Sequence, residues 1–311
     1  MLALALALGA SVCWGSGDFL GGFSTRRASL WAVIIGSQAV GLVGAAAVVL
    51  IAGRGWPGLD AVWPVLLGGL ASVVAISCFY KALAIGWMSI VAPLSATNAA
   101  IPFLAGLAAG ERPTSLQLAG IALAALGVLL VAIEPARSGT IGVGALPNEP
   151  AVEPATAAGL FSAGRSVDAP AHRRRDQRRA VGLALVAAVC MGLVLIGYDM
   201  TARHDALWAM LGGRLSSAVL FTVAFVALRP RVRIARSALP LIVAVGLLDT
   251  GANGLFALAT TQGYLSIAAV LASLYPVVTV VLAYALLRER LAAHQVAGAV
   301  ATIVGIVLVA A

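Results

Sequence analysis

Apolar residues occur along this chain in ten long runs, separated by short polar stretches. Each run is about twenty residues long, the length that a helix needs to cross the hydrocarbon of a bilayer. Backbone groups in lipid find no partner outside the chain, so the crossing segments must be helices. We therefore predict ten transmembrane helices, at about 2–20, 30–52, 62–85, 88–109, 115–133, 180–200, 206–228, 238–262, 265–287 and 293–311.

The pattern breaks between the fifth and sixth runs. Residues 136–178 are rich in Pro, Gly, Ser and Ala, and no apolar period persists in them. A segment of this kind cannot bury enough apolar surface to offset the chain entropy lost on folding. The sequence thus predicts a first unit over 1–135, a flexible, disordered linker over 136–178 and a second unit over 179–311.

The two units repeat one another. A shift of 177 residues places Trp31 on Trp208, and a shift of 178 pairs Glu111 with Glu289. Matches at Trp and Glu arise by chance less readily than matches among Ala, Leu and Val. Five helices is an odd number, so the second unit must cross the membrane in the opposite sense. The predicted fold is an all-α integral membrane protein with two inverted five-helix repeats.

The distribution of arginine predicts the orientation. Loops after odd-numbered helices hold fifteen arginines, whereas the opposite loops hold three, Arg54, Arg112 and Arg203. Loops rich in Arg and Lys stay on the cytoplasmic side of the membrane. We expect a cytoplasmic linker and both termini outside, in a plasma or inner membrane.

Composition agrees with lipid as the solvent of this chain. Hydrophobic residues make up 61% of it and charged residues 10%, with a mean hydropathy of +1.03. Soluble domains carry about 25% charged residues. The net charge of +8 comes from basic side chains placed between apolar runs, where anionic lipid and the orientation rule account for them. The lipid bilayer is the expected partner, and no nucleic acid is expected.

The motifs of enzymes do not occur in the sequence. The three cysteines lie inside apolar runs without CxxC spacing, and the three histidines fall in loops or at helix ends. Neither pattern suits a metal or a disulfide. No phosphate-binding loop or nucleophile motif occurs either. We therefore expect no enzyme, no cofactor and no ATP-driven pump.

Four stretches carry a family resemblance. They are WGSGDFLGG (Trp14 to Gly22), SLYPVVTVVLAYALLRER (Ser273 to Arg290), and the two unit endings GERPTSLQLAGIALAALGVLLVA and RERLAAHQVAGAVATIVGIVLVA. In this order the chain resembles the EamA family of the drug/metabolite transporter superfamily. The resemblance implies ten helices, with the fifth and tenth peripheral and the other eight around a central cavity. It also implies export or exchange of small metabolites such as amino acids, or of drugs.

Charges in the middle of a span are costly and need a reason. Asp249 and Arg214 qualify clearly, whereas Asp18 lies nearer the end of its run. Asn253 follows Asp249 at i+4, which makes a polar stripe on one helix face. Asp249 could bind a substrate amine, carry a proton, form a static salt bridge with Arg214 or be merely solvated. Arg214 could instead hold a substrate carboxylate.

Four uncharged residues complete the candidate substrate pathway. Trp14 could stack on an apolar or cationic ligand, or serve ordinary packing or anchoring at the membrane interface. Tyr198 and Tyr275 are pathway candidates too, with an interfacial or packing role as the alternative. Asn98 could line the cavity or form a hydrogen bond between helices. Prolines beside Tyr275 and Asn98 predict kinks in the ninth and fourth helices.

These features predict a secondary transporter of a small organic metabolite such as an amino acid, with protons as a candidate coupling ion. One alternative is a proton-coupled exporter of cationic drugs, with Asp249 as acceptor of both proton and drug. The other is a membrane scaffold without transport activity.

Overall fold

The computed structural model describes residues 1–25, 27–85, 94, 96–132, 170–287 and 293–310. Within these ranges the chain forms helices, apart from one isolated antiparallel bridge between Ala28 and Ile234. The elements are α1 (Leu2–Ser24), α2 (Leu30–Ile51), α3 (Leu59–Ile85), η1 (Ala96–Ala99), α5 (Ala100–Ala108), α6 (Ser115–Ala132), α7 (Pro170–Ala202), α8 (Ala206–Leu228), η3 (Arg236–Ala238), α9 (Leu239–Gln262), α10 (Leu265–Ala272), α11 (Tyr275–Leu287) and α12 (Ala293–Ala310).

Helix occurs in each of the ten predicted segments. Seven helical segments are long and apolar enough to cross a bilayer, judged by length and composition. Three shorter apolar helices, Thr97–Ala108, Ser115–Val131 and Ala293–Val309, coincide with the fourth, fifth and tenth predicted spans. The first part of the fourth, residues 86–93, lies outside the described residues. The all-helical fold of a membrane protein is thus confirmed.

The predicted linker is too long at its C-terminal end. Helix α7 begins at Pro170, so residues 170–178 are helical. Proline is tolerated in the first helical turn, and the Arg and Gln residues that follow favour helix. A search for apolar periodicity missed this polar helical extension. The remaining linker residues, 136–169, lie outside the described residues.

The outer surface of the bundle is apolar. Many large aliphatic side chains point outward from the helices, where a water-soluble helix would carry polar groups. Examples are Val43, Leu50, Val219, Val223, Val226, Val300, Ile303 and Val307. This surface suits contact with lipid tails and explains the high hydropathy of the chain.

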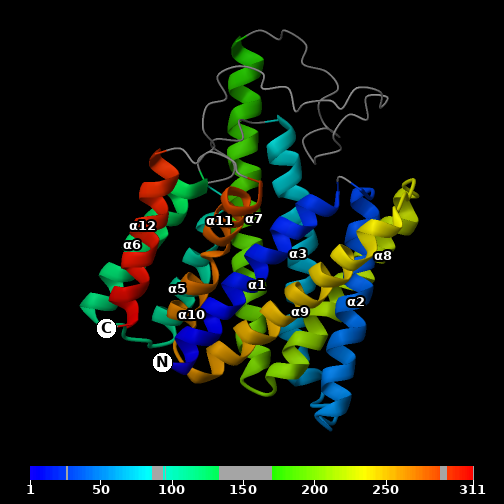
Figure 1. Ribbon diagram of the computed structural model, residues 1–311. Coiled ribbons are helices and arrows are strands. Elements are labelled where there is room, and N and C mark those ends of the chain that lie inside the picture. Colours follow the sequence, from blue (N-terminus) through cyan, green and yellow to red (C-terminus); the bar gives the residue numbers. More distant parts are fainter. Residues whose placement is uncertain (26, 86–93, 95, 133–169, 288–292, 311) are drawn as a thin grey trace.

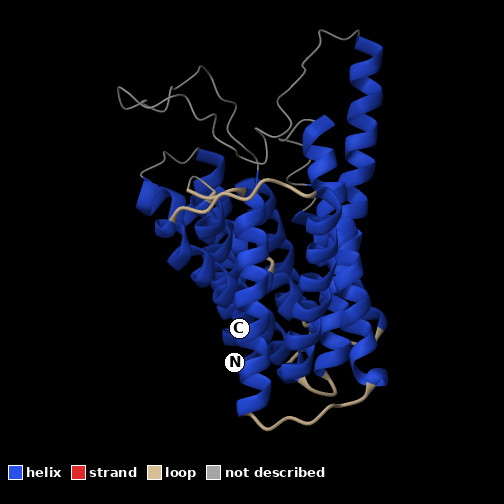
Figure 2. Ribbon diagram, turned by 90° about the vertical axis from the view of Figure 1, so that its right-hand side faces the viewer, coloured by secondary structure: helices blue, strands red, loops and turns tan. Residues whose placement is uncertain are grey.

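The two units interlock, because helices of one unit pack mainly on helices of the other. Helix α1 packs on α9, and α3 packs on α7 (Figure 1). By the sequence repeat α1 corresponds to α7 and α3 to α9, so these are the same packing made twice. The elements lie in one bundle with their loops at its two ends (Figure 2).

Glycines bring α6 and α12 into backbone contact. A methyl group on Gly120 would lie 2.7 Å from the carbonyl oxygen of Gly305, and one on Gly305 would lie 2.7 Å from that of Gly120. Gly127 and Gly298 face each other in the same way. Gly120 is the repeat equivalent of Gly298, and Gly127 of Gly305. The contact is therefore antiparallel and self-complementary, as across a two-fold axis.

One end of the bundle carries the start of α7. There the loop between α1 and α2 pairs with the segment between α8 and α9. The backbone N–H of Ser29 donates to the carbonyl of Arg233 (2.8 Å), and that of Ala235 donates to the carbonyl of Arg27 (3.2 Å). Figure 1 shows these loops and the first turns of α7 at the same end, which we name the linker end.

The opposite end joins the loop between α2 and α3 to the loop between α7 and α8. Arg54 forms an ion pair with Asp205 (Nε to Oδ2, 3.7 Å), and the Trp208 indole N–H donates to the carbonyl of Gly55 (2.7 Å). Both termini lie toward this end in Figures 1 and 2, and we name it the terminal end.

A dense apolar core fills the terminal half of the bundle. It includes Ala7 and Ala10 of α1, Phe256 and Ala257 of α9, and the whole of α10, whose eight residues are all buried. Small side chains let the helices approach closely there.

Candidate functional site

A cavity of about 310 Å³ lies inside the bundle, next to this core. Its size suits a small ligand. Several lining residues lie in the linker-end halves of their helices, such as Gln38 in α2, Ile76 in α3 and Phe221 in α8. The cavity therefore extends from the middle of the bundle toward the linker end.

The cavity collects the residues that sequence reasoning selected. All seven candidates line it: Trp14, Asn98, Tyr198, Arg214, Asp249, Asn253 and Tyr275. They come from α1, η1, α7, α8, α9 and α11, so both units contribute. The fold thus brings together in one cavity side chains that are up to 261 residues apart in the sequence.

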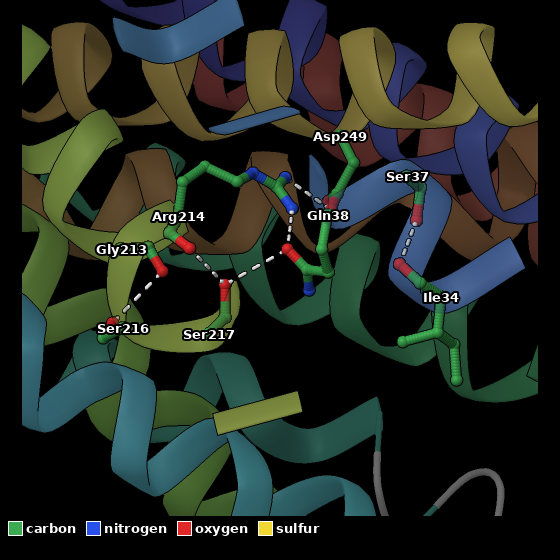
Figure 3. A network of polar contacts seen from close by, with 8 residues as sticks. All are labelled: Ile34, Ser37, Gln38, Gly213, Arg214, Ser216, Ser217 and Asp249. Atoms are coloured by element: carbon green, nitrogen blue, oxygen red, sulfur yellow. Dashed lines mark hydrogen bonds and ion pairs between the residues drawn. The ribbon is translucent and has the colours of Figure 1, made fainter. Parts of the chain in front are cut away.

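A polar network crosses the wall of the cavity (Figure 3). The Arg214 guanidinium forms an ion pair with Asp249 through Nη2 and Oδ2. Its Nη1 donates to Oε1 of Gln38 (3.0 Å), and the Ser217 hydroxyl donates to the same oxygen (3.3 Å). The network joins α2 of the first unit to α8 and α9 of the second.

The two partners of the ion pair differ in exposure. The side chain of Arg214 is 3% exposed, whereas that of Asp249 is 41% exposed. The guanidinium lies behind the pair and the carboxylate faces the cavity. A buried arginine needs an anionic partner to offset its desolvation. Asp249 provides this charge and still presents its carboxylate to the cavity.

Glycines make room for these side chains. A methyl group on Gly41 would collide with Oγ1 of Thr250 and would lie 3.1 Å from Nε of Arg214, so glycine leaves the room that the guanidinium occupies. A methyl group on Gly213 would collide with the hydroxyl of Tyr198. The close packing holds Arg214 and Tyr198 in fixed positions at the wall of the cavity.

Two broken helices bound the other side of the cavity. The ninth segment stops at Ala272 and resumes at Tyr275 as α11, where Pro276 lacks a backbone N–H. The fourth segment contains the short 3₁₀ turn η1 with Asn98 before α5 begins. The Ser273 hydroxyl at the first break faces Oδ1 of Asn98 (3.4 Å). The predicted kink in the ninth helix is confirmed, and polar side chains gather at both breaks.

Trp14 and Tyr275 form the aromatic part of the wall. Their ring centroids are 6.4 Å apart with planes at 74°, an edge-to-face arrangement. Trp14 also contacts Phe256 of the apolar core, with centroids 6.0 Å apart. Packing and cavity lining, which the sequence left as alternatives for Trp14, therefore both apply.

Among the polar residues of the cavity that sequence reasoning missed, Asp18 and Gln38 have the longest side chains. Asp18 was placed near a helix end because the predicted first helix stopped at residue 20. Helix α1 continues to Ser24, so Asp18 lies more than one turn inside it. Gln38 carries no charge and gave no signal beyond a polar residue in an apolar run.

The cavity also follows the sequence repeat. Five lining residues of the first unit lie 177 positions before five lining residues of the second. The pairs are Trp14 with Met191, Asp18 with Leu195, Ser72 with Asp249, Ile76 with Asn253, and Asn98 with Tyr275. Each acidic residue has an uncharged counterpart, so the charges of the cavity are arranged asymmetrically on a symmetric frame.

The described residues contain no group of three or more His, Cys, Asp and Glu side chains that could hold a metal ion. The charged side chains that line the cavity within that part of the chain are Asp18, Arg214 and Asp249. The chemistry available in the cavity is therefore ionic recognition, hydrogen bonding and aromatic contact.

Comparison with known proteins agrees with this architecture. The EamA-like transporter family matches residues 1–133 and 178–311. One crystal structure, described only as that of a protein, has a TM-score of 0.72 to this chain, with 18% identity over 98% of this chain and 94% of that chain. At that identity the likeness establishes the fold alone. No curated protein matches in sequence.

A helical bundle with an apolar exterior and a polar internal cavity defines a multi-pass membrane protein of the transporter class. The family match covers both units of the chain. The protein belongs to the EamA-like transporter family, and so to the drug/metabolite transporter superfamily.

Proposed function

We propose that this protein is a secondary transporter of a small organic metabolite, which exports or exchanges its solute by alternating access between two inverted five-helix repeats. The observation that carries the proposal is the cavity, because equivalent positions of both units line it around the Arg214–Asp249 pair. Transporters with inverted repeats bind their solute near the midplane, between the repeats and beside broken helices. This cavity lies between the two units and beside two broken helices.

Ten spans and an inverted second repeat are part of this proposal. The antiparallel glycine contacts between α6 and α12 support the inversion, because equivalent helices meet there in opposite directions. The loops support it too. The loop after the first span pairs with the loop after the seventh, and the loop after the second meets the loop after the sixth. Of the loops that the structure describes, the first and seventh thus lie at one end and the second and sixth at the other.

We further propose that the linker end is cytoplasmic and that both termini lie outside, in the plasma or inner membrane. The basic residues support this orientation. Arg27, Arg229, Arg231, Arg233 and Arg236 belong to loops of the linker end, whereas Arg54 and Arg203 belong to loops of the terminal end. In this orientation the cavity extends toward the cytoplasm.

Protons are the coupling ion that the cavity supports best. Asp18 and Asp249 are carboxylates that line the cavity. A carboxylate in such a place can take up a proton on one side of the membrane and release it on the other. A scaffold would gain nothing from a buried guanidinium next to a cavity. Flux that responds to an imposed pH gradient would support proton coupling.

Transport is tested with purified protein in lipid vesicles loaded with a mixture of small metabolites. Mass spectrometry of the external medium should show loss of a limited set of solutes, faster than from vesicles without protein. The Asp249→Asn variant should show greatly reduced flux per folded, inserted molecule, because asparagine keeps the shape but carries neither charge nor proton. Equal release from vesicles with and without protein would contradict the proposed function.

A further inference from the structure

Asp18 is a carboxylate that lines the cavity and has no basic partner among the described residues. It is exposed and lines the cavity, and no Lys, Arg or His side chain of the described residues forms an ion pair with it. A charged group in the membrane interior usually has a partner or a functional role. Asp18 has no such partner among the described residues, so its place in the cavity calls for a functional role.

The charges of the cavity leave one negative charge in excess. Two carboxylates, Asp18 and Asp249, face one guanidinium, that of Arg214. Arg214 is 3% exposed and already contacts Asp249 and Gln38, so little of its guanidinium is open to a substrate carboxylate. The cavity thus exposes its anionic groups more than its cation.

An aromatic wall lies beside this carboxylate. Trp14 precedes Asp18 by four residues, so both side chains lie on one face of α1. The Trp14 ring meets Tyr275 edge to face, with centroids 6.4 Å apart. Aromatic faces attract alkylammonium groups and also pack against apolar carbon chains. A carboxylate one turn from a tryptophan suits a solute with a positive nitrogen and an apolar body.

We infer that the solute is a small organic amine, whose ammonium group binds between the carboxylates of Asp18 and Asp249 beside the ring of Trp14. Asp18 is then the residue that sets the preference for amines over zwitterionic amino acids and over organic acids. The inference rests on the proposed function and narrows the class of its solute. It moves the preferred class from amino acids to amines, because the cavity has no exposed cation for a carboxylate among the described residues.

Three probe compounds of similar shape test this inference. Phenethylamine has a ring and an amine, phenylalanine adds a carboxylate to them, and 3-phenylpropionate has the ring and the carboxylate alone. Binding of each to the purified full-length protein is measured by titration calorimetry in detergent. We expect phenethylamine to bind, phenylalanine to bind more weakly by about tenfold or more, and 3-phenylpropionate to give no binding.

Variants assign the effect to Asp18. The Asp18→Asn variant should bind phenethylamine about tenfold or more weakly, because it loses a charge-assisted hydrogen bond. Asp18→Glu keeps the charge and should retain most of the binding. Asp60→Asn is the matched control, since Asp60 is exposed at the start of α3 and does not line the cavity. If Asp18→Asn fails to fold, the three probes with the wild-type protein and with Asp18→Glu still decide.

The outcomes separate this inference from the proposed function. Phenylalanine or 3-phenylpropionate binding as tightly as phenethylamine would overturn it, as would unchanged binding in Asp18→Asn or no binding of phenethylamine at millimolar concentration. Vesicles that release acids or zwitterions but no amines would overturn the inference and leave the transporter function standing. Amine binding without any flux would support the inferred site and contradict transport.

Discussion

Asp249 touches both the buried guanidinium of Arg214 and the cavity, so an ion pair and a solute site are not alternatives at this residue. The pair fixes the position of the carboxylate, and the exposed part of the carboxylate remains available to a solute. The unequal exposure of the partners, 3% for Arg214 and 41% for Asp249, also makes the two single substitutions unequal.

The substitution Asp249→Asn should be the more damaging to stability. It leaves the buried Arg214 charge without an anion, which costs about 3 kcal/mol or more. Arg214→Gln leaves a carboxylate that the cavity can hydrate, and should cost about 1 kcal/mol. The double variant should recover much of the stability lost in Asp249→Asn. Thermal unfolding in detergent measures all four proteins as a double-mutant cycle.

The same four proteins test the role of Asp249 in transport. If Asp249 binds the solute, flux should stay low in the double variant although its stability returns. Recovery of flux together with stability would show that Asp249 serves only to hold Arg214. Normal flux in the single Asp249→Asn variant would also rule out a role in transport.

The sequence predicts the charged residues of this site better than its uncharged ones. Asp249 and Arg214 stand out because a charge in mid-span is costly, and the repeat shows that their counterparts, Ser72 and Ser37, are uncharged. Asp18 was set aside because its place relative to the helix end depends on a boundary that hydropathy fixes only within a few residues. Gln38 is found only through its contact with Arg214.

At the scale of elements, the N-terminus of α10 in the second unit is capped by a residue of the first unit. The Glu111 carboxylate accepts hydrogen bonds from the backbone N–H groups of Leu265 (2.7 Å) and Ser266 (3.0 Å) at the N-terminus of α10. Glu111 and Arg112 are adjacent in the loop between α5 and α6, where a surface ion pair would be the simplest role for them. The structure instead shows a carboxylate that caps a helix across the two units, which satisfies unpaired donors and interacts favourably with the helix dipole.

Removal of this charge should loosen α10. Glu111→Gln keeps one acceptor oxygen but loses the second, and should lower stability by about 1 kcal/mol. Ser266 is fully buried, so its accessibility reports on the loosening of α10. For this purpose Ser266 is replaced by cysteine in a variant that lacks Cys13, Cys78 and Cys190. Maleimide should label Ser266→Cys faster when Glu111→Gln is present.

The neighbouring residue provides the control for this experiment. Arg112 is exposed, and Arg112→Gln should change neither the stability nor the labelling rate. If Arg112→Gln and Glu111→Gln have equal effects, the capping role of Glu111 is wrong and a surface ion pair explains the residue better.

Helices α6 and α12 provide a second prediction at this scale. Neither helix contributes a side chain to the cavity, yet their glycines place the two backbones in contact. Gly127→Leu should force the helices apart and lower stability by about 1–3 kcal/mol. Flux per folded molecule should stay near the wild-type value, measured in vesicles with equal amounts of inserted protein. A loss of flux with unchanged stability would place α6 in the transport cycle.

Element positions follow from hydropathy more fully than element ends do. All ten predicted segments contain helix, because twenty apolar residues without charge leave few other structures in lipid. Helix ends in water depend on propensity and capping instead. This is why the polar residues 170–178 extend α7 and why α1 passes the predicted end at residue 20.

At the scale of the whole molecule, the same helix packing recurs between the two units, whereas the interior is asymmetric. The repeated packing of α1 on α9 and α3 on α7 and the reciprocal glycine contacts are the arrangement expected from the proposed inverted repeats. An inverted repeat can exchange the conformations of its two units, which closes one end and opens the other. In the proposed transport cycle, the cavity on the linker-end side of the bundle would belong to one of these two states.

This arrangement predicts where reporters fused to the chain will lie. A reporter inserted near Glu153, in the linker outside the described residues, should be active in the cytoplasm, and one at the C-terminus should be active outside. The reason is that loops of the linker end carry most of the arginines, which resist translocation, while both termini lie at the opposite end. A reporter between α2 and α3, after Gly55, should lie outside with the C-terminus, since that loop contacts Trp208 at the terminal end. Paired fluorescent and alkaline phosphatase reporters measure each position from both sides. A cytoplasmic C-terminus with an external Gly55 reporter would contradict the count of ten spans, whereas reversal of all three positions would leave the count intact and contradict only the orientation.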